Sequence, residues 1–127
     1  MSWYVDDLLA DSDRCELLCL DLTKAERLRA RQPSVGELER LASVAKALGS
    51  STRLAIALAL RAGGEACVCD LGWVLGRDEK LVSHHLRQLR AAGLARSERR
   101  GKMVLYSLTE RGRELVEALD ESPVVVD

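Results

Sequence analysis

Apolar residues recur at helical intervals along most of the 127-residue chain, and this pattern predicts a mainly α-helical protein. Leu8, Cys15, Leu18, Cys19 and Leu22 follow such a spacing, so we expect a first helix over about residues 8–31, which Pro33 ends. Further helices are expected from the Ser34 cap up to Gly49 and over about residues 52–62, 68–75, 79–92 and 110–119. Residues 94–98 and 103–108 read as two strands joined by a turn at residues 100–101.

The order of these elements predicts a winged helix-turn-helix, a mainly α-helical fold with a small β-hairpin. Gly76 separates two short helices and supplies the expected turn, and Asp78 is placed to cap the second of them. We therefore expect an N-terminal helical arm over residues 1–33, a winged helix-turn-helix domain over 34–120 and a loose tail over 121–127.

The helix over residues 79–92 has the two faces expected of a DNA-reading helix. Its inward stripe is predicted to be Leu81, His85, Leu86 and Leu89. The opposite face mixes short polar with long basic side chains, which permits close approach to a major groove and contacts to bases and phosphates. Its candidate DNA-binding residues are Lys80, Ser83, His84, Arg87 and Arg90. A solvated helix face is the alternative, and the basic hairpin that follows, with Arg96, Arg99, Arg100 and Lys102, argues against it.

The charge is unevenly distributed, although the net charge of the chain is only −1. Residues 1–22 contain six acidic residues and one basic residue, whereas residues 77–102 contain eight basic and three acidic residues. A basic segment inside a nearly neutral protein is typical of a local phosphate-binding surface.

Four cysteines occur as two close pairs, Cys15/Cys19 and Cys67/Cys69. A spacing of four would place Cys15 and Cys19 on one helical face, and Cys67 and Cys69 could bind one ion together where the chain is extended or begins a helix. Buried apolar cysteine is the alternative for either pair alone. Thiolates select soft metals, and four of them leave no open position for a catalytic water, so a regulatory or structural metal site is expected.

The N-terminus lacks the basic start of a signal peptide, and no run of residues is long and apolar enough to span a membrane. We therefore expect a cytoplasmic protein without a membrane partner, in which thiols stay reduced. The sequence contains neither a glycine-rich phosphate loop nor a glycine-flanked nucleophile, so no enzyme is expected.

Several motifs resemble the ArsR/SmtB family of metal-responsive repressors. They are Cys67-Val-Cys-Asp-Leu, Val82-Ser-His-His-Leu86 and Gly101-Lys-Met-Val-Leu-Tyr-Ser-Leu108, and the resemblance covers about residues 35–119. Cys15-Glu-Leu-Leu-Cys19 further resembles the CadC branch, which senses cadmium, lead and zinc. The resemblance implies a homodimer joined mainly by its first and last helices, bound to a palindromic operator as a repressor. It also implies release by a metal held across the dimer by Cys15, Cys19, Cys67 and Cys69.

Two positions depart from the family pattern. Gly72 stands where arsenic sensors often carry a third cysteine, which leaves no three-sulfur site within that helix. The last helix has no histidine and has Gly112 near one expected zinc-ligand position, so we expect this second site to be absent. The alternatives are an As(III)-responsive or thiol-redox-responsive repressor of the same fold, and a zinc-stabilised interaction module.

Overall fold

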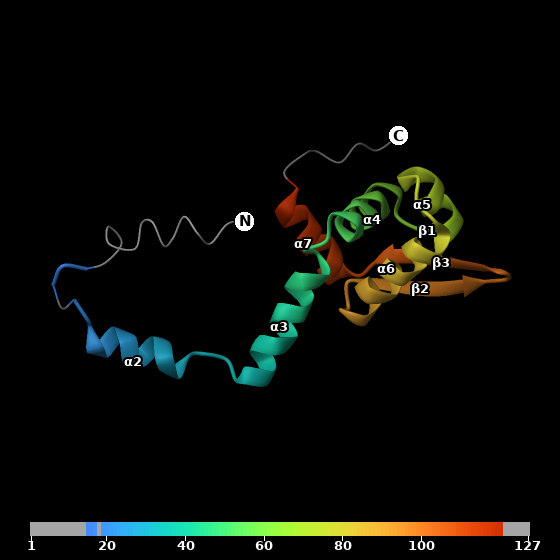
Figure 1. Ribbon diagram of the computed structural model, residues 1–127. Coiled ribbons are helices and arrows are strands. Elements are labelled where there is room, and N and C mark those ends of the chain that lie inside the picture. Colours follow the sequence, from blue (N-terminus) through green and yellow to red (C-terminus); the bar gives the residue numbers. More distant parts are fainter. Residues whose placement is uncertain (1–14, 18, 121–127) are drawn as a thin grey trace. The chain divides into compact units, whose positions relative to one another are not determined.

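The computed structural model describes residues 15–17 and 19–120, and the chain divides into two units, residues 1–34 and 35–127. The first unit contains α2, which runs Leu22–Ala30 (Figure 1). Asp21 begins this helix, because its side chain accepts a hydrogen bond from the Lys24 amide at 3.1 Å. None of the nine residues of α2 is buried.

The expected helix over residues 8–31 is confirmed for Leu22–Ala30 and is wrong for the described residues before Leu22. Residues 8–14 and Leu18 lie outside the described part, and Cys15 and Cys19 are not helical. Asp21 has an extended backbone, with φ −90° and ψ 97°, so the helix cannot continue through it. Helical spacing of apolar residues does not stabilise a short helix without tertiary packing, and Leu17 and Leu20 are 81% and 65% exposed.

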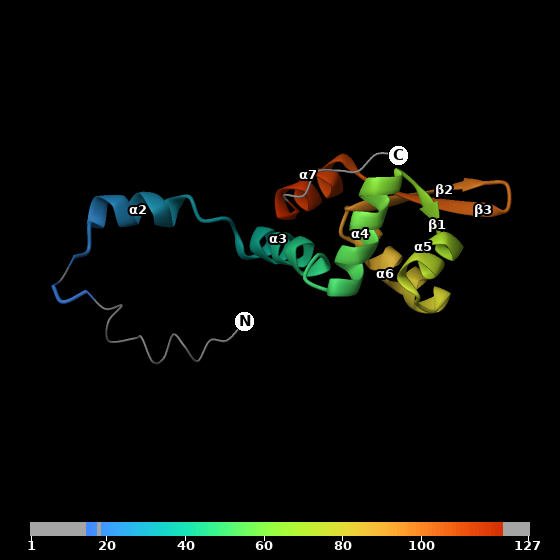
Figure 2. The same ribbon diagram turned by 90° about the horizontal axis from the view of Figure 1, so that it is seen from above.

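The second unit is a winged helix-turn-helix, as the sequence predicts. Its elements are α3 Val35–Ala47, α4 Ser51–Gly63, β1 Ala66–Cys67, α5 Val68–Leu75, α6 Glu79–Ala91, β2 Ala95–Arg100, β3 Met103–Leu108 and α7 Glu110–Leu119. The hairpin of β2 and β3 projects beyond the helices as the wing, and α3 extends away from the other helices of its unit (Figures 1 and 2).

The three strands form an antiparallel sheet in the order β1-β3-β2. The sequence did not predict β1, whose two residues pair with Tyr106 and Leu105 of β3. β2 extends to Arg100, which pairs with Met103, so the turn lies at Gly101 and Lys102 rather than at residues 100–101. Gly101 has φ 62°, a left-handed backbone conformation that glycine adopts without strain.

The core lies where α4, α5, α6, α7 and the sheet meet. Its fully buried side chains are Ile56, Leu60, Leu71, Val82, Leu86, Leu89, Leu94 and Val116. Leu86 and Leu89 are therefore core residues of α6 as predicted, but Leu81 is 38% exposed and Val82 takes the inward position. Val82, Leu86 and Leu89 follow the i, i+4, i+7 spacing of one helical face, and Leu81 lies at its edge.

The C-terminal helix α7 packs closely on the start of the wing. A Cβ atom at Gly112 would collide with the carbonyl oxygen of Leu94, so only glycine fits at this contact. Thr109 caps α7 by accepting from the Gly112 amide at 3.1 Å, and its own hydroxyl donates to the Gly93 carbonyl at 2.8 Å. Among the described residues, no helix is long and apolar enough to cross a membrane.

Candidate metal and DNA-binding sites

Cys67 and Cys69 lie at the junction between the sheet and the helix-turn-helix. Cys67 pairs with Leu105 in the sheet and is also the N-cap residue of α5, with an extended backbone of φ −90° and ψ 168°. Cys69 follows in the first turn of α5 and is exposed. The pair is therefore an extended residue followed by a helix start, the arrangement that the sequence analysis required for two sulfurs to bind one ion.

The Cys69 thiol contacts the reading helix directly. Its Sγ donates to Oε1 of Glu79, the first residue of α6, over 3.6 Å. The negative charge of Glu79, followed by that of Cys67, raises the pKa of Cys69. Gly72 lies beside this contact, and a Cβ there would be 3.3 Å from the Glu79 Cγ. Gly72, which stands where arsenic sensors often carry a third cysteine, is thus bordered by the Glu79 side chain.

Cys15 and Cys19 are both exposed, in the non-helical segment before α2. Their thiols are hydrogen-bonded to each other, and this bond raises the pKa of Cys15. These two cysteines are therefore not on the helical face that their spacing predicted. Among the described residues, no three Cys, His, Asp or Glu side chains meet at a point that could hold a metal ion. Each pair on its own supplies two sulfurs, and four-sulfur ligation requires both pairs.

The outer face of α6 carries the candidate DNA-binding residues. Lys80, His84, Arg87 and Arg90 are exposed, and Ser83 is half-buried. Arg87 donates to the Ser83 hydroxyl at 3.0 Å, and Lys80, Ser83 and Arg87 border a hollow of about 450 Å³. Arg90 donates to Ser97 of β2 at 2.9 Å, which links α6 to the wing. The structure thus places all five residues on one continuous helix with solvent access.

The basic residues of the wing differ in their surroundings. Arg100 donates to both carboxylate oxygens of Glu65, at 2.8 and 3.1 Å, and to Glu98 at 3.1 Å. Arg99 donates to the Gly101 carbonyl at 3.4 Å, and Lys102 is exposed in the hairpin turn. The charge of Arg100 is therefore balanced within the protein, whereas Arg99 and Lys102 present theirs at the tip of the wing.

His84 and His85 have separate environments, as the sequence analysis expected. His84 is exposed on the outer face of α6, and His85 is half-buried with its Nδ1 3.2 Å from an Nη1 of Arg53. Burial lowers the pKa of His85, and the charges of Arg53 and His84 lower it further against a hydrogen bond with Gln88 that raises it. His85 is thus a hydrogen-bonded residue at the edge of the core.

Sequence reasoning did not identify Arg53 or Glu79 as functional residues. Arg53 follows the Ser50 cap in the first turn of α4 and contacts residues more than thirty positions away. Glu79 is a helix-start residue like many others in sequence. No motif or periodicity reports either contact, because each depends on how α4, α5 and α6 pack.

The family model described as bacterial regulatory protein, arsR family, matches residues 50–97, which span α4 to the beginning of β2. The chain is 37% identical over 106 residues to a cadmium resistance transcriptional regulatory protein CadC homolog of Staphylococcus aureus, covering 83% of this chain and 87% of the relative.

Two further relatives extend this result. The transcriptional repressor SmtB homolog of Synechocystis sp. is 38% identical over 109 residues, covering 80% of this chain and 82% of the relative. The solution structure of a homodimeric winged helix-turn-helix DNA-binding domain from Mycobacterium bovis, a possible ArsR-family transcriptional regulator, superposes with a TM-score of 0.62. It is 29% identical and covers 71% of this chain and 85% of that domain.

Proposed function

The chain belongs to the arsR family of bacterial regulatory proteins, and from this premise we propose that it is a repressor released from DNA by thiophilic metal ions. The family consists of DNA-binding transcriptional regulators, not enzymes, and this chain is an ArsR/SmtB-type transcriptional repressor. The ion is cadmium, lead or zinc, and Cys15, Cys19, Cys67 and Cys69 are its ligands. The names of the Staphylococcus and Synechocystis relatives place this chain beside CadC and SmtB proteins and support a metal effector.

The repressor acts as a homodimer on a palindromic operator. In the winged helix-turn-helix unit the first and last helices are α3 and α7. The exposed apolar residues of α3, among them Leu38 and Leu41, and Leu119 at the end of α7 support an interface formed by these two helices. Each protomer then presents α6 to one half-site, with Lys80, Ser83, His84, Arg87 and Arg90 toward the major groove. Arg99, Arg100 and Lys102 of the wing lie toward the phosphates, and the internal pairing of Arg100 makes it the weakest contributor.

One observation carries the proposal: the thiol of Cys69 is hydrogen-bonded to the first residue of the reading helix. A change in the bonding of Cys69 therefore acts on α6 directly, through the side chain of Glu79. The four cysteines fit a soft divalent ion, because none is in a disulfide and none lies deep in the core. Ligation removes the thiol proton, so Cys69 can no longer donate to Glu79.

Release from DNA requires that the metal-bound dimer favour an arrangement that does not fit the operator. Because coupling between two binding sites is reciprocal, operator DNA must weaken metal binding by the same factor. The arm of one protomer, held by Cys15 and Cys19 to the Cys67/Cys69 pair of its partner, would tilt the reading helices away from half-sites one DNA turn apart.

The test is a titration of the operator-bound protein in reducing buffer, with cadmium in one arm and a thiol oxidant in the other. We expect cadmium to release the DNA in parallel with ultraviolet thiolate-to-metal absorption, and a chelator to restore binding. Release by the oxidant alone would favour the redox alternative, in which the cysteine pairs form disulfides. Unfolding of the protein on removal of metal would favour structural zinc. Release by arsenite alone would favour an As(III) sensor.

A further inference from the structure

The side chain of Arg53 connects the C-terminal end of α3 to α4 and α6. Every residue of α3 from Val35 to Ser43 is exposed, and Ala47 in the last turn is its one buried residue. The last carbonyl groups of a helix have no partner within the helix. Arg53 donates to two carbonyls of the last turn, from Nε to Ala47 at 2.7 Å and from Nη2 to Lys46 at 3.3 Å. The Lys46 carbonyl also accepts from the Gly49 amide at 3.0 Å.

The same guanidinium also binds the middle of α6. Its Nη1 donates to Oε1 of Gln88 at 2.6 Å and lies 3.2 Å from Nδ1 of His85. Arg53 itself is fixed at the start of α4, where its backbone amide donates to the Ser50 hydroxyl at 3.3 Å. One planar cation therefore connects the end of α3, the beginning of α4 and the centre of α6, and its fork of donors sets the angles between them.

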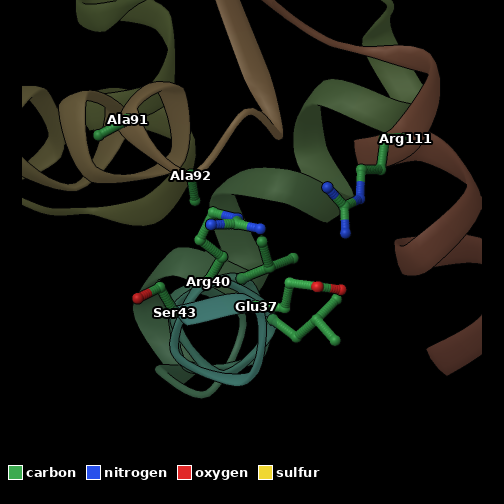
Figure 3. A pocket seen from close by; sticks show the side chains of 8 residues that line it. Glu37, Arg40, Ser43, Ala91, Ala92 and Arg111 are labelled. Carbon is green, nitrogen blue, oxygen red and sulfur yellow. The ribbon is translucent and has the colours of Figure 1, made fainter. Parts of the chain in front are cut away.

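Apolar packing between α3 and α6 is incomplete on either side of this bridge. A hollow of about 400 Å³ lies between α3 and α6 and is bordered by Lys46, Arg53 and Gln88. A second hollow of about 400 Å³ adjoins α3, α6 and α7, and Figure 3 shows Arg40 of α3 and Arg111 of α7 pointing into it. Ala47 joins the end of α3 to the core, with Val44 and Leu48 packed beside it. Around this small contact the directional hydrogen bonds of Arg53 add a constraint on the angle between the two helices.

We infer that Arg53 is a positioning residue that transmits the geometry of the dimer interface on α3 to the reading helix α6, and thereby sets the half-site spacing that the dimer accepts. The inference rests on the proposed role of α3 in the dimer. In a dimer joined through α3, the separation and tilt of the two α6 helices follow from the α3-to-α6 angle within each protomer. Operator recognition depends on that separation, because two reading helices must reach half-sites one helical turn apart.

The experiment compares two DNA duplexes: a palindromic operator obtained from random DNA by in vitro selection with the wild-type protein, and the same operator with one base pair inserted between its half-sites. Wild-type protein is expected to prefer the selected spacing. Arg53→Met removes all four contacts of the guanidinium and should reduce that preference about tenfold, within the usual range of coupling between sites. Binding to a single half-site should stay unchanged, which a general loss of folding would not produce.

A matched control and a second variant make the result decisive. Lys46→Met removes a cation at the same junction but keeps the carbonyl that Arg53 binds, so it should retain the spacing preference. Gln88→Leu removes the shorter of the two contacts that Arg53 makes with α6, keeps the one with His85 and leaves the α3 end intact. It serves if Arg53→Met does not fold. Each variant is checked for its dimer dissociation constant and melting temperature.

Retention of the wild-type spacing preference in a folded, dimeric Arg53→Met or Gln88→Leu variant would overturn the inference. An equal loss of preference in Lys46→Met would also overturn it, because charge rather than the bridge would then be responsible. No metal is added at any step, so the failure of metal sensing would appear in the cadmium titration and not here. A monomeric wild-type protein would instead refute the proposed dimer interface.

Discussion

Cys67 and Cys69 lie on elements that the hydrophobic core holds in place, whereas Cys15 and Cys19 precede a helix with no buried residue. The first pair is bounded by a sheet pairing with Leu105 and by the buried Leu71 of α5. The second pair is exposed, and the Asp21 cap of α2 follows it.

This difference suggests a division of roles within one metal site. A pair on a fixed scaffold can pass a change to the reading helix, because Cys69 already contacts Glu79. A pair in an exposed segment can move to complete the ligand set, and the energy of ligation then orders that segment. A sensor needs both properties, since a site complete in advance would have no second arrangement to stabilise.

The largest expected effect is on metal response. Cys67→Ser or Cys69→Ser should abolish release by Cd(II) or Pb(II) and leave operator affinity near the wild-type value, because these sulfurs lie at the start of α5 and not on the outer face of α6. Fluorescence anisotropy with labelled operator, with and without metal, measures both quantities. A folded variant that had lost DNA binding would remove the separation between sensing and reading.

The second largest effect is expected on stability, where a core substitution and a substitution in the exposed segment before α2 should differ. Leu86→Ala in the core should lower the free energy of unfolding by about 2–5 kcal/mol, because it leaves a cavity among fully buried side chains. Leu20→Ala in the exposed segment is the matched control and should leave the unfolding curve of the second unit, residues 35–127, unchanged. Urea denaturation followed by circular dichroism compares them, and a similar loss for both would mean that the segment packs on a core.

Within the basic surface, α6 and the wing should contribute differently to DNA binding. Arg87→Ala should cost about 1–3 kcal/mol and relax the preference at one base pair, as expected for a base contact. Lys102→Ala should weaken binding to all sequences, as expected for a phosphate contact. It should also reduce the slope of log affinity against log salt concentration by about one. Affinities for operator and random DNA over a salt series give both values. Equal losses on the two DNAs for Arg87→Ala would exclude direct readout by that residue.

The smallest effect is expected from His85. Its pKa is below the ordinary value of 6.5 in the folded protein, so the unfolded chain takes up a proton first as the pH falls. The contribution of His85 to stability is therefore complete above about pH 6.5 and is lost as the pH falls through its folded pKa. His85→Asn should have a flatter dependence of unfolding free energy between pH 7.5 and 5.5 than wild type. Parallel curves for the two proteins would show that His85 does not titrate differently on folding.

The elements of the winged helix-turn-helix unit were predicted well from the sequence, because the apolar residues that repeat there are buried in its core. Leu86 and Leu89 repeat at helical spacing and are buried, and Gly76 and Gly101 mark turns that have positive φ. The same periodicity gave a wrong helix start before Leu22, because the described residues among 15–22 are all exposed and Asp21 caps the helix. The short strand β1 depends on pairing with β3 some forty residues away. The Arg53 bridge likewise exists only after three helices have packed.

The most direct test of the central claim asks whether the two cysteine pairs bind one ion across the dimer. One protomer carries Cys67→Ser and Cys69→Ser, and the other carries Cys15→Ser and Cys19→Ser. Neither homodimer can form a four-sulfur site, whereas their purified heterodimer can form one site if ligation crosses the interface. We predict that the heterodimer recovers one tight cadmium site with ultraviolet thiolate-to-metal absorption. A confirmed heterodimer without that absorption would contradict the account.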